Sequence, residues 1–240
     1  NLDEPETIIV EKIPQVDAAP KSEKERVTLV SNARIHYARG EWQTALENQR
    51  KSINIIGQWE NSPLIANRNI ELAIISLELN HFRGQGNYSE AETALRCNLD
   101  LNYRLHETYC LLCTLFAQQG RLEQAKDCLI QEENIQFKGG DYIDKVSREC
   151  AVFELAYVQG HWEEAVKASE SYMELLRDHG YRWGWARRLI DLGDALQGRG
   201  QPGDRERAQQ VYQQSLEMFT DMGAPGYIEV LNQRLAALDN

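Results

Sequence analysis

The sequence predicts an all-α protein, built from about five helix–turn–helix repeats and closed by one further helix. A six-residue phrase recurs along the chain: a glycine, a polar residue, an aromatic residue or leucine, two further residues and an alanine. Apolar residues at helical spacing precede and follow its copies. Self-similarity at a period of roughly 20–50 residues is typical of helical repeat arrays.

The phrase occurs as "GEWQTA", "GNYSEA", "GRLEQA" and "GHWEEA", with a longer fifth copy, "GQPGDRERA". Their closing alanines, at positions 45, 91, 125, 165 and 208, are separated by 46, 34, 40 and 43 residues. We expect each glycine to end one helix in a conformation that other residues resist. The aromatic residue or leucine would pack into the joint, and the alanine would let the next helix approach closely.

Apolar residues before each glycine lie on one helical face. Upstream of the third copy, Tyr109, Leu112, Cys113 and Phe116 stand at i, i+3, i+4 and i+7. Such patterns predict repeats at residues 23–57, 62–101, 105–137, 142–178 and 183–221, and a capping helix at 226–238 that Pro225 opens. Residues 1–21 contain three prolines and five acids, which indicates a linker or extended arm before a repeat domain at 22–240. Within this arm, "TIIVEKI" could also pair as a strand with another segment.

The third and fifth copies match the tetratricopeptide pattern of large, small and glycine positions. The third matches at Tyr109, Leu112, Cys113, Phe116, Gly120, Leu122, Ala125 and Leu129. The fifth matches at Leu189, Leu192, Gly193, Leu196, Gly200, Ala208 and Tyr212. The other copies depart from the pattern at Asn32, His36, Leu79 and Glu149.

Residues 22–240 therefore resemble the tetratricopeptide-repeat superfamily. Their long, loose repeats are closest in style to those of the maltose-regulon transcriptional activator and related bacterial signalling ATPases. The resemblance implies a right-handed superhelical α-solenoid in which the first helix of each pair lines a concave groove that binds a partner.

Composition narrows the class of function. The net charge of −11 argues against nucleic acid as a partner, since binding to phosphates usually needs a basic face. The sequence contains no run of 18 apolar residues, so we expect no membrane-spanning helix. Five cysteines within apolar helical patterns favour a reducing, cytoplasmic setting. Because the sequence begins with Asn1, we expect it to be part of a larger protein.

Two stretches invite a chemical interpretation. In "CLLC", Cys110 and Cys113 could hold zinc with His106 nearby, or form a redox dithiol. A structural zinc site needs four convergent ligands, however, and a small buried core residue is the simpler role for a free cysteine. In "YRWGWARR", residues 181–188, the two tryptophans could stack on a ligand ring or on arginines. We expect them to pack in the core, with the arginines solvated.

We expect no enzyme, because no nucleophile, metal or phosphate-binding constellation is recognisable. We accordingly expect no catalytic residue, no metal and no cofactor.

The family resemblance implies groove-facing residues, from which we expect contacts with a protein or peptide partner. They are Arg34, Tyr37, Asn80, Arg83, Thr114, Glu154, Tyr157, Arg187 and Asp194. The resulting hypothesis is a non-catalytic scaffold or regulatory module. The alternative is a sensor domain of a signalling ATPase or transcription activator, in which a small-molecule effector shifts a two-state equilibrium. A scaffold should show an open groove, and a sensor should show a compact pocket where the superhelix closes on itself.

Overall fold

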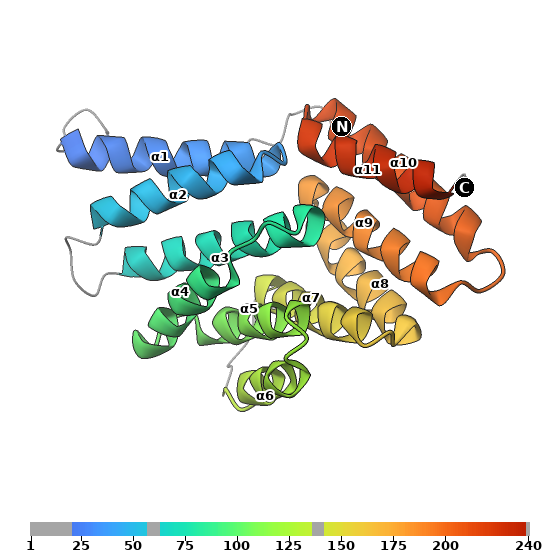
Figure 1. The fold of residues 1–240 in the computed structure, drawn as a ribbon, viewed down its shortest axis with the longest axis horizontal. Helices are drawn as coiled ribbons and strands as arrows, with labels where there is room; N and C mark the ends of the chain where they lie inside the picture. The colour runs from blue at the N-terminus through green and yellow to red at the C-terminus, as the bar shows by residue number, and fades with distance from the viewer. Residues whose placement is uncertain (1–20, 57–62, 136–141, 239–240) are drawn as a thin grey trace.

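The computed structural model describes residues 21–56, 63–135 and 142–238, and this part of the chain forms eleven α-helices and no strand (Figure 1). The prediction of an all-α protein is confirmed. The helices are α1 (Lys21–Ala38), α2 (Trp42–Ile56), α3 (Pro63–Arg83), α4 (Tyr88–Asp100), α5 (Leu105–Gln118), α6 (Leu122–Glu133), α7 (Tyr142–Val158), α8 (Trp162–Asp178), α9 (Arg182–Arg199), α10 (Asp204–Asp221) and α11 (Pro225–Leu238). The predicted arm, apart from its last residue Lys21, lies outside the described residues.

Successive helices form five hairpins, α1–α2, α3–α4, α5–α6, α7–α8 and α9–α10, and α11 packs against α10. Gly40, Gly120, Gly160 and Gly200 follow the first helix of their hairpins with φ between 63° and 72°. After α5, the amide of Gly120 donates to Ala117 and the next amide donates to Phe116, the hydrogen-bond pattern of a Schellman cap.

The second hairpin departs from the predicted turn. There Gly84 follows α3 with a φ of 64°, two residues before Gly86, to which the repeated phrase assigns this role. Gly86 serves packing instead, since a Cβ atom on it would lie 2.3 Å from the carbonyl oxygen of Ser76.

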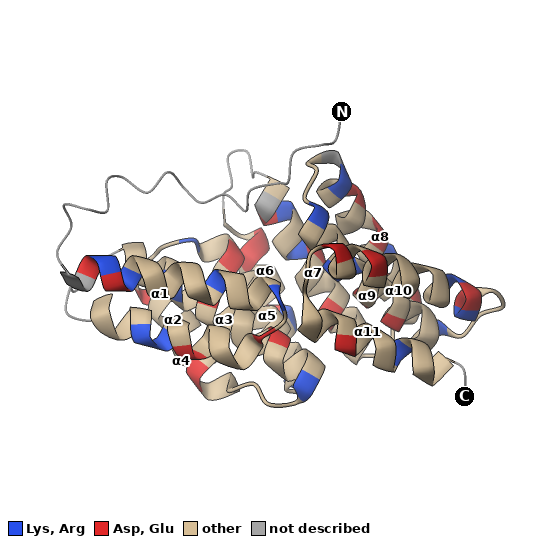
Figure 2. Ribbon diagram, turned by 90° about the horizontal axis from the view of Figure 1, so that it is seen from above, with Lys and Arg blue, Asp and Glu red and all other residues tan. Residues whose placement is uncertain are grey.

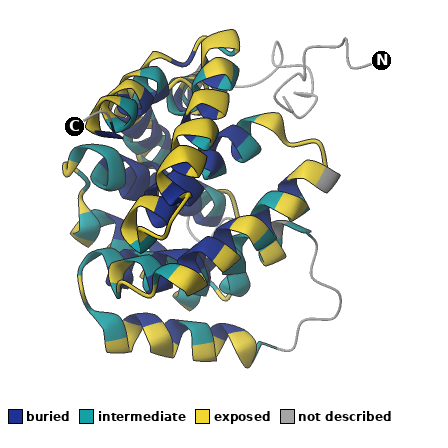
Figure 3. Cartoon of the chain, turned by 90° about the vertical axis from the view of Figure 1, so that its right-hand side faces the viewer, coloured by how far each residue is buried: buried dark blue, intermediate teal, exposed yellow. Residues whose placement is uncertain are grey.

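The repeated alanines lie in the interior of the array. Ala45, Ala91, Ala125, Ala165 and Ala208 are all fully buried. Figure 3 shows that buried residues line the inward faces of the helices.

Basic and acidic residues are mixed along the helices in the view of Figure 2. None of the described helices combines the length and apolarity needed to cross a bilayer.

The array closes on itself, because the α1–α2 turn meets α9 and α11 (Figure 1). The amide of Gly226 donates to the carbonyl of Arg39 at 3.0 Å, and the Trp183 indole donates to the carbonyl of Ala38 at 3.0 Å. Trp42 packs edge-on against Tyr227, with 5.1 Å between ring centroids. One hydrophobic cluster consequently joins α2 and α3 to α7–α11, and a second joins α3–α7.

Alanine at Gly40 should weaken this closure. A Cβ atom there would lie 2.8 Å from the Cα of Gly226, whereas Gly120 has the same φ of 72° and open space around it. Gly120→Ala should therefore cost only the left-handed backbone strain of about 1 kcal/mol. Gly40→Ala should cost about 2–4 kcal/mol in total. Urea unfolding of both variants measures the difference. Equal losses in the free energy of unfolding would show that the Gly40–Gly226 contact does not stabilise the protein.

Candidate functional site

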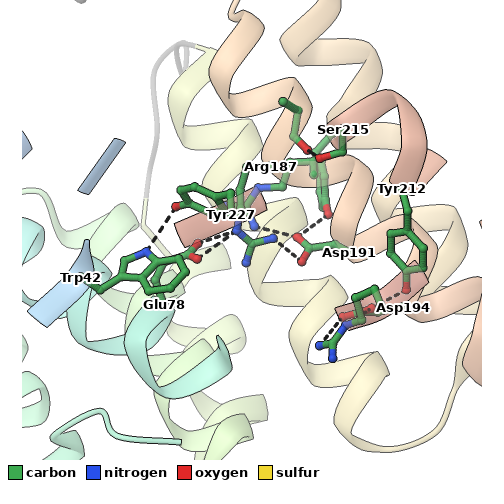
Figure 4. A network of polar contacts seen from close by, with 12 residues as sticks. Trp42, Glu78, Arg187, Asp191, Asp194, Tyr212, Ser215 and Tyr227 are labelled. Atoms are coloured by element: carbon green, nitrogen blue, oxygen red, sulfur yellow. Dashed lines mark hydrogen bonds and ion pairs between the residues drawn. The ribbon is translucent and has the colours of Figure 1, made fainter. Parts of the chain in front are cut away.

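A buried guanidinium joins the second hairpin to the fifth. Arg187 of α9 is 3% exposed, and its Nε donates to both carboxylate oxygens of Glu78 on α3, at 2.8 and 2.9 Å. Its Nη1 donates to Asp191, one turn along α9, at 2.6 Å. The Phe82 ring lies 4.5 Å from the guanidinium carbon. Figure 4 shows these charged groups pointing toward one another between the two helices.

Asp191 is the carboxylate at the centre of this network. It is 1% exposed and accepts hydrogen bonds from the Tyr172 hydroxyl and from Arg188 Nη1, both at 2.8 Å. Burial by itself raises the pKa of this carboxyl group. The neighbouring Arg187 and Arg188 outweigh burial, however, and hold the pKa of Asp191 well below its ordinary value. Asp191 is therefore ionised and fully compensated.

A second buried carboxylate ties α9 to α10 and α11. Asp194 accepts from the Tyr212 hydroxyl at 2.5 Å and from Arg234 at 2.9 and 3.1 Å. Burial raises the pKa of Asp194, and the charge of Arg234 opposes that rise. The capping helix α11 is thus bound to the array through a charged group on the same inner side as Arg187.

Two further inner residues are titratable, one of them buried and the other half-buried. Glu154 of α7 is 7% exposed and hydrogen-bonds to Gln118. Burial, and then the negative charge of Asp191, raise its pKa to about 7. His81 of α3 has its pKa lowered to about 3, first by burial and then by the charge of Arg187, so its imidazole is neutral. Its Nε2 has no hydrogen-bond partner among the described residues.

An exposed ion pair completes the closure at its rim. Arg83, at the end of α3, donates to both carboxylate oxygens of Glu229 on α11, at 3.0 and 2.7 Å. Nearby, the Trp42 indole donates to the Tyr227 hydroxyl at 3.4 Å. Long side chains, rather than a broad helix–helix interface, hold these elements together.

The structure places the nine expected groove residues in three environments. Glu154, Arg187 and Asp194 are buried together within the inner network. Half-buried positions are taken by Tyr37, Asn80, Arg83, Thr114 and Tyr157. Arg34 is exposed and pairs with Glu71 at 2.8 Å. Around Glu154, Arg187 and Asp194, side chains of the protein itself cover the inner side.

In the "YRWGWARR" stretch, the prediction is confirmed for both tryptophans, which pack against the main hydrophobic cluster, and for the exposed Arg182. It is wrong for Arg187 and Arg188. Trp183 packs beside Tyr37, with 5.3 Å between ring centroids. Arg187 and Arg188, expected to be solvated, instead pair inside the array with Asp191, because that carboxylate lies one helical turn further on. In "CLLC", Cys113 is a fully buried core residue, as expected.

The spacing of Arg187 and Asp191 at i and i+4 was a readable sign of an ion pair within one helix. The sequence does not indicate the pairs Glu78–Arg187 and Arg234–Asp194, because their members are 109 and 40 residues apart.

The sequence matches no model of a known protein family, and a search of curated proteins finds no match. The significance of the site therefore depends on its geometry. A hollow of about 640 Å³ lies elsewhere, among α2, α3 and α4, where Ile53, Asn69 and Leu72 contribute to its lining. The ion pair between Arg187 of α9 and Glu78 of α3 connects the second hairpin to the fifth. Removing one partner of a buried ion pair is costly, because it leaves the other charge uncompensated.

Replacing Arg187 should be far more costly than replacing a neighbouring arginine at the surface. Arg187→Met leaves Glu78 buried without its partner, so we expect a loss of about 3–5 kcal/mol in the free energy of unfolding. Arg182→Met, on the same helix, removes an exposed pair with Asp221 and should cost at most about 1 kcal/mol. A denaturation series that includes Glu78→Gln and the double variant should give a coupling of about 1–3 kcal/mol. Similar losses for the two arginine variants would contradict a network role.

Glu154 should make stability depend on pH. Its pKa of about 7 in the folded protein exceeds its ordinary value of 4.5, so the folded state holds the proton more tightly. The stabilisation from this group is complete below pH 4.5 and is lost as the pH rises through 7, up to about 3 kcal/mol.

Glu154→Gln cannot ionise at this position, so the variant should not lose stability in this way. The free energy of unfolding of Glu154→Gln minus that of the native protein should therefore increase between pH 5 and pH 8. Chemical denaturation across this range measures it, with Glu217→Gln on the exposed face of α10 as the control. A constant difference across the range would contradict the expectation.

Proposed function

We propose that this chain is a non-catalytic regulatory module that binds a protein or peptide segment through its inner helices. Its architecture would be that of the tetratricopeptide superfamily: a right-handed superhelical α-solenoid of five helix–turn–helix repeats with α11 as the capping helix. Five successive hairpins, the left-handed glycines that follow their first helices and a buried alanine in each second helix support this assignment.

One observation carries the functional part of the proposal: the inner side holds charged groups that bind one another across the array. Arg187 Nε donates to both carboxylate oxygens of Glu78, and such charge-assisted hydrogen bonds are the means by which a guanidinium recognises a carboxylate. An acidic side chain of a partner can take the place of Glu78 once the closure opens. The closed array is then the resting state, and the partner stabilises the open one.

The closure also sets how strongly a partner binds. If the open form makes up about 1% of the protein, the apparent affinity is lower than the intrinsic affinity by about 100-fold. Any change that weakens the closure should therefore strengthen binding, while the contacts with the partner stay the same.

A small-molecule sensor remains the second candidate, because one observation favours it. The hollow among α2, α3 and α4 is large enough for a small ligand. Arg50 and Glu90 pair at its edge, with contacts of 2.8 and 2.5 Å. An effector there would act on the α2–α3 packing and so on the position of Glu78.

Reversing the charges of the rim pair tests the proposal without disturbing the buried network. Arg83→Glu and Glu229→Arg each replace an attraction with a repulsion at the surface, while the double reversal restores the attraction. Each single variant should bind a partner a few-fold more tightly than the native protein, and the double variant should bind like the native protein.

The measurement is crosslinking capture from cell lysate, followed by titration of the captured segment against each variant. Arg96→Glu, which breaks an exposed pair with Glu92 on α4, is the matched control and should change nothing. Small-angle scattering of the same samples reports whether the array opens. Equal capture by all variants, or an open array with unchanged binding, would refute the proposal.

A further inference from the structure

Among the described residues, Glu154 is a buried carboxylate without an ion-pair partner. It is 7% exposed on α7, and its hydrogen-bond partner is the neutral side-chain amide of Gln118 on α5. The guanidinium groups that act on it electrostatically, those of Arg187 and Arg188, pair with other carboxylates. An ionised carboxylate in such a place is costly, because burial removes water and no paired cation replaces it.

The charges of the neighbouring network already cancel. Its two positive charges belong to Arg187 and Arg188, and its two negative charges belong to the carboxylates that they bind, Glu78 and Asp191. His81 faces the same groups from α3 and is neutral, because burial and then the charge of Arg187 lower its pKa to about 3. A third carboxylate at this place must carry a proton if the network is to stay neutral.

The other titratable groups around this carboxylate supply no charge. From α4, α5 and α7 they are Tyr88, Cys113 and Tyr157. Burial raises the pKa of each to about 12, so all three are neutral at physiological pH. From α8, the hydroxyl of Tyr172 donates to Asp191. From α6, Glu132 pairs with Arg148 of α7.

A chain of hydrogen bonds joins Glu154 to the second hairpin. The Asn80 side chain of α3 donates to the Tyr88 hydroxyl, and that hydroxyl donates to Oε1 of Gln118 at 3.4 Å. The same amide group of Gln118 bonds to Glu154. The second hairpin also carries Glu78, the carboxylate that crosses the closure to α9. The surroundings of the buried carboxylate therefore depend on the hairpin that the closure holds in place.

We propose that a proton on Glu154 favours the closed array, and that release of this proton favours the open one. Movement of α3 away from α9 would give water access to the carboxylate, and water can then stabilise its negative charge. The proposal rests on the opening that the proposed function requires, but no partner is needed for the proton to act.

The direction of the effect follows from the pKa of Glu154. Burial, and then the negative charge of Asp191, raise this pKa from its ordinary value of 4.5 to about 7 in the closed array. The closed form binds the proton more tightly, so closure is strongest below pH 4.5 and weakens as the pH rises through 7. If the open form has the ordinary pKa, the ratio of closed to open protein should fall about tenfold between pH 6 and pH 8.

Hydrogen exchange at the joint measures this ratio. The amide of Gly226 donates to the carbonyl of Arg39 across the joint. The indole of Trp183 donates to the carbonyl of Ala38 there as well, so both protons exchange when the joint opens. Their protection factors, which correct for the intrinsic exchange rate at each pH, should fall about tenfold from pH 6 to pH 8 in the native chain. The amide of Gly120, whose hydrogen bond lies within the α5–α6 turn, should show no such fall.

Two variants assign the effect to its residue. Glu154→Gln cannot ionise, so its protection at Gly226 should stay constant between pH 6 and pH 8. His36→Gln removes a pair with Glu41 beside the α1–α2 turn, and it should retain the native fall in protection. Circular dichroism checks that both variants remain helical. If Glu154→Gln unfolds, the profiles of the native chain and of His36→Gln still decide the proposal.

The proposal fails if protection at the joint does not fall in the native chain, if Glu154→Gln shows the same fall, or if His36→Gln abolishes it. The rim variants distinguish this failure from that of the proposed function. If Arg83→Glu lowers the protection of Gly226 while a rise in pH does not, the array opens independently of the proton, and only the pH inference is overturned. If neither change lowers it, the array does not open and both proposals are overturned.

Discussion

The ion pair between Arg187 and Glu78 is the constraint on which the shape of the molecule depends. A guanidinium that is 3% exposed must have anionic partners, because an unpaired charge in that position would be very costly. One of its partners, Asp191, is local, but the other lies on α3, 109 residues earlier in the chain. The second and fifth hairpins must therefore come together wherever this charge is buried. The Arg83–Glu229 pair and the Trp42–Tyr227 contact then form around an arrangement that this requirement has already fixed.

Closure changes the kind of array that the hairpins make. In an open repeat protein each unit contacts only its neighbours, so stability is nearly a sum of local terms. Here the turn after α1 touches the start of α11, where Gly40 and Gly226 bring two backbones together without side chains between them. The hairpins have their own buried alanines and apolar contacts, so each hairpin contains packing that does not depend on this contact. The molecule thus combines strong local units with a narrow long-range joint, and such a joint can open separately from the rest.

This difference between local and long-range contacts explains what the sequence could and could not predict. Helical spacing and the repeated phrase encode the hairpins, and the alanines lie where the pattern places them. The phrase failed only at Gly86, because another glycine two residues earlier was free to end α3. The burial of Glu154, Arg187 and Asp194 was not predictable, because a repeat pattern defines the inner face of each helix but not what covers it.

The charged groups around Arg187 balance one another, and this balance limits what the network could bind. Around Arg187 the anionic groups Glu78 and Asp191 already have arginine partners, so a cation there would have to displace Arg187 or Arg188. Such a network can exchange one carboxylate for another, as a partner would require, while the buried charge stays paired.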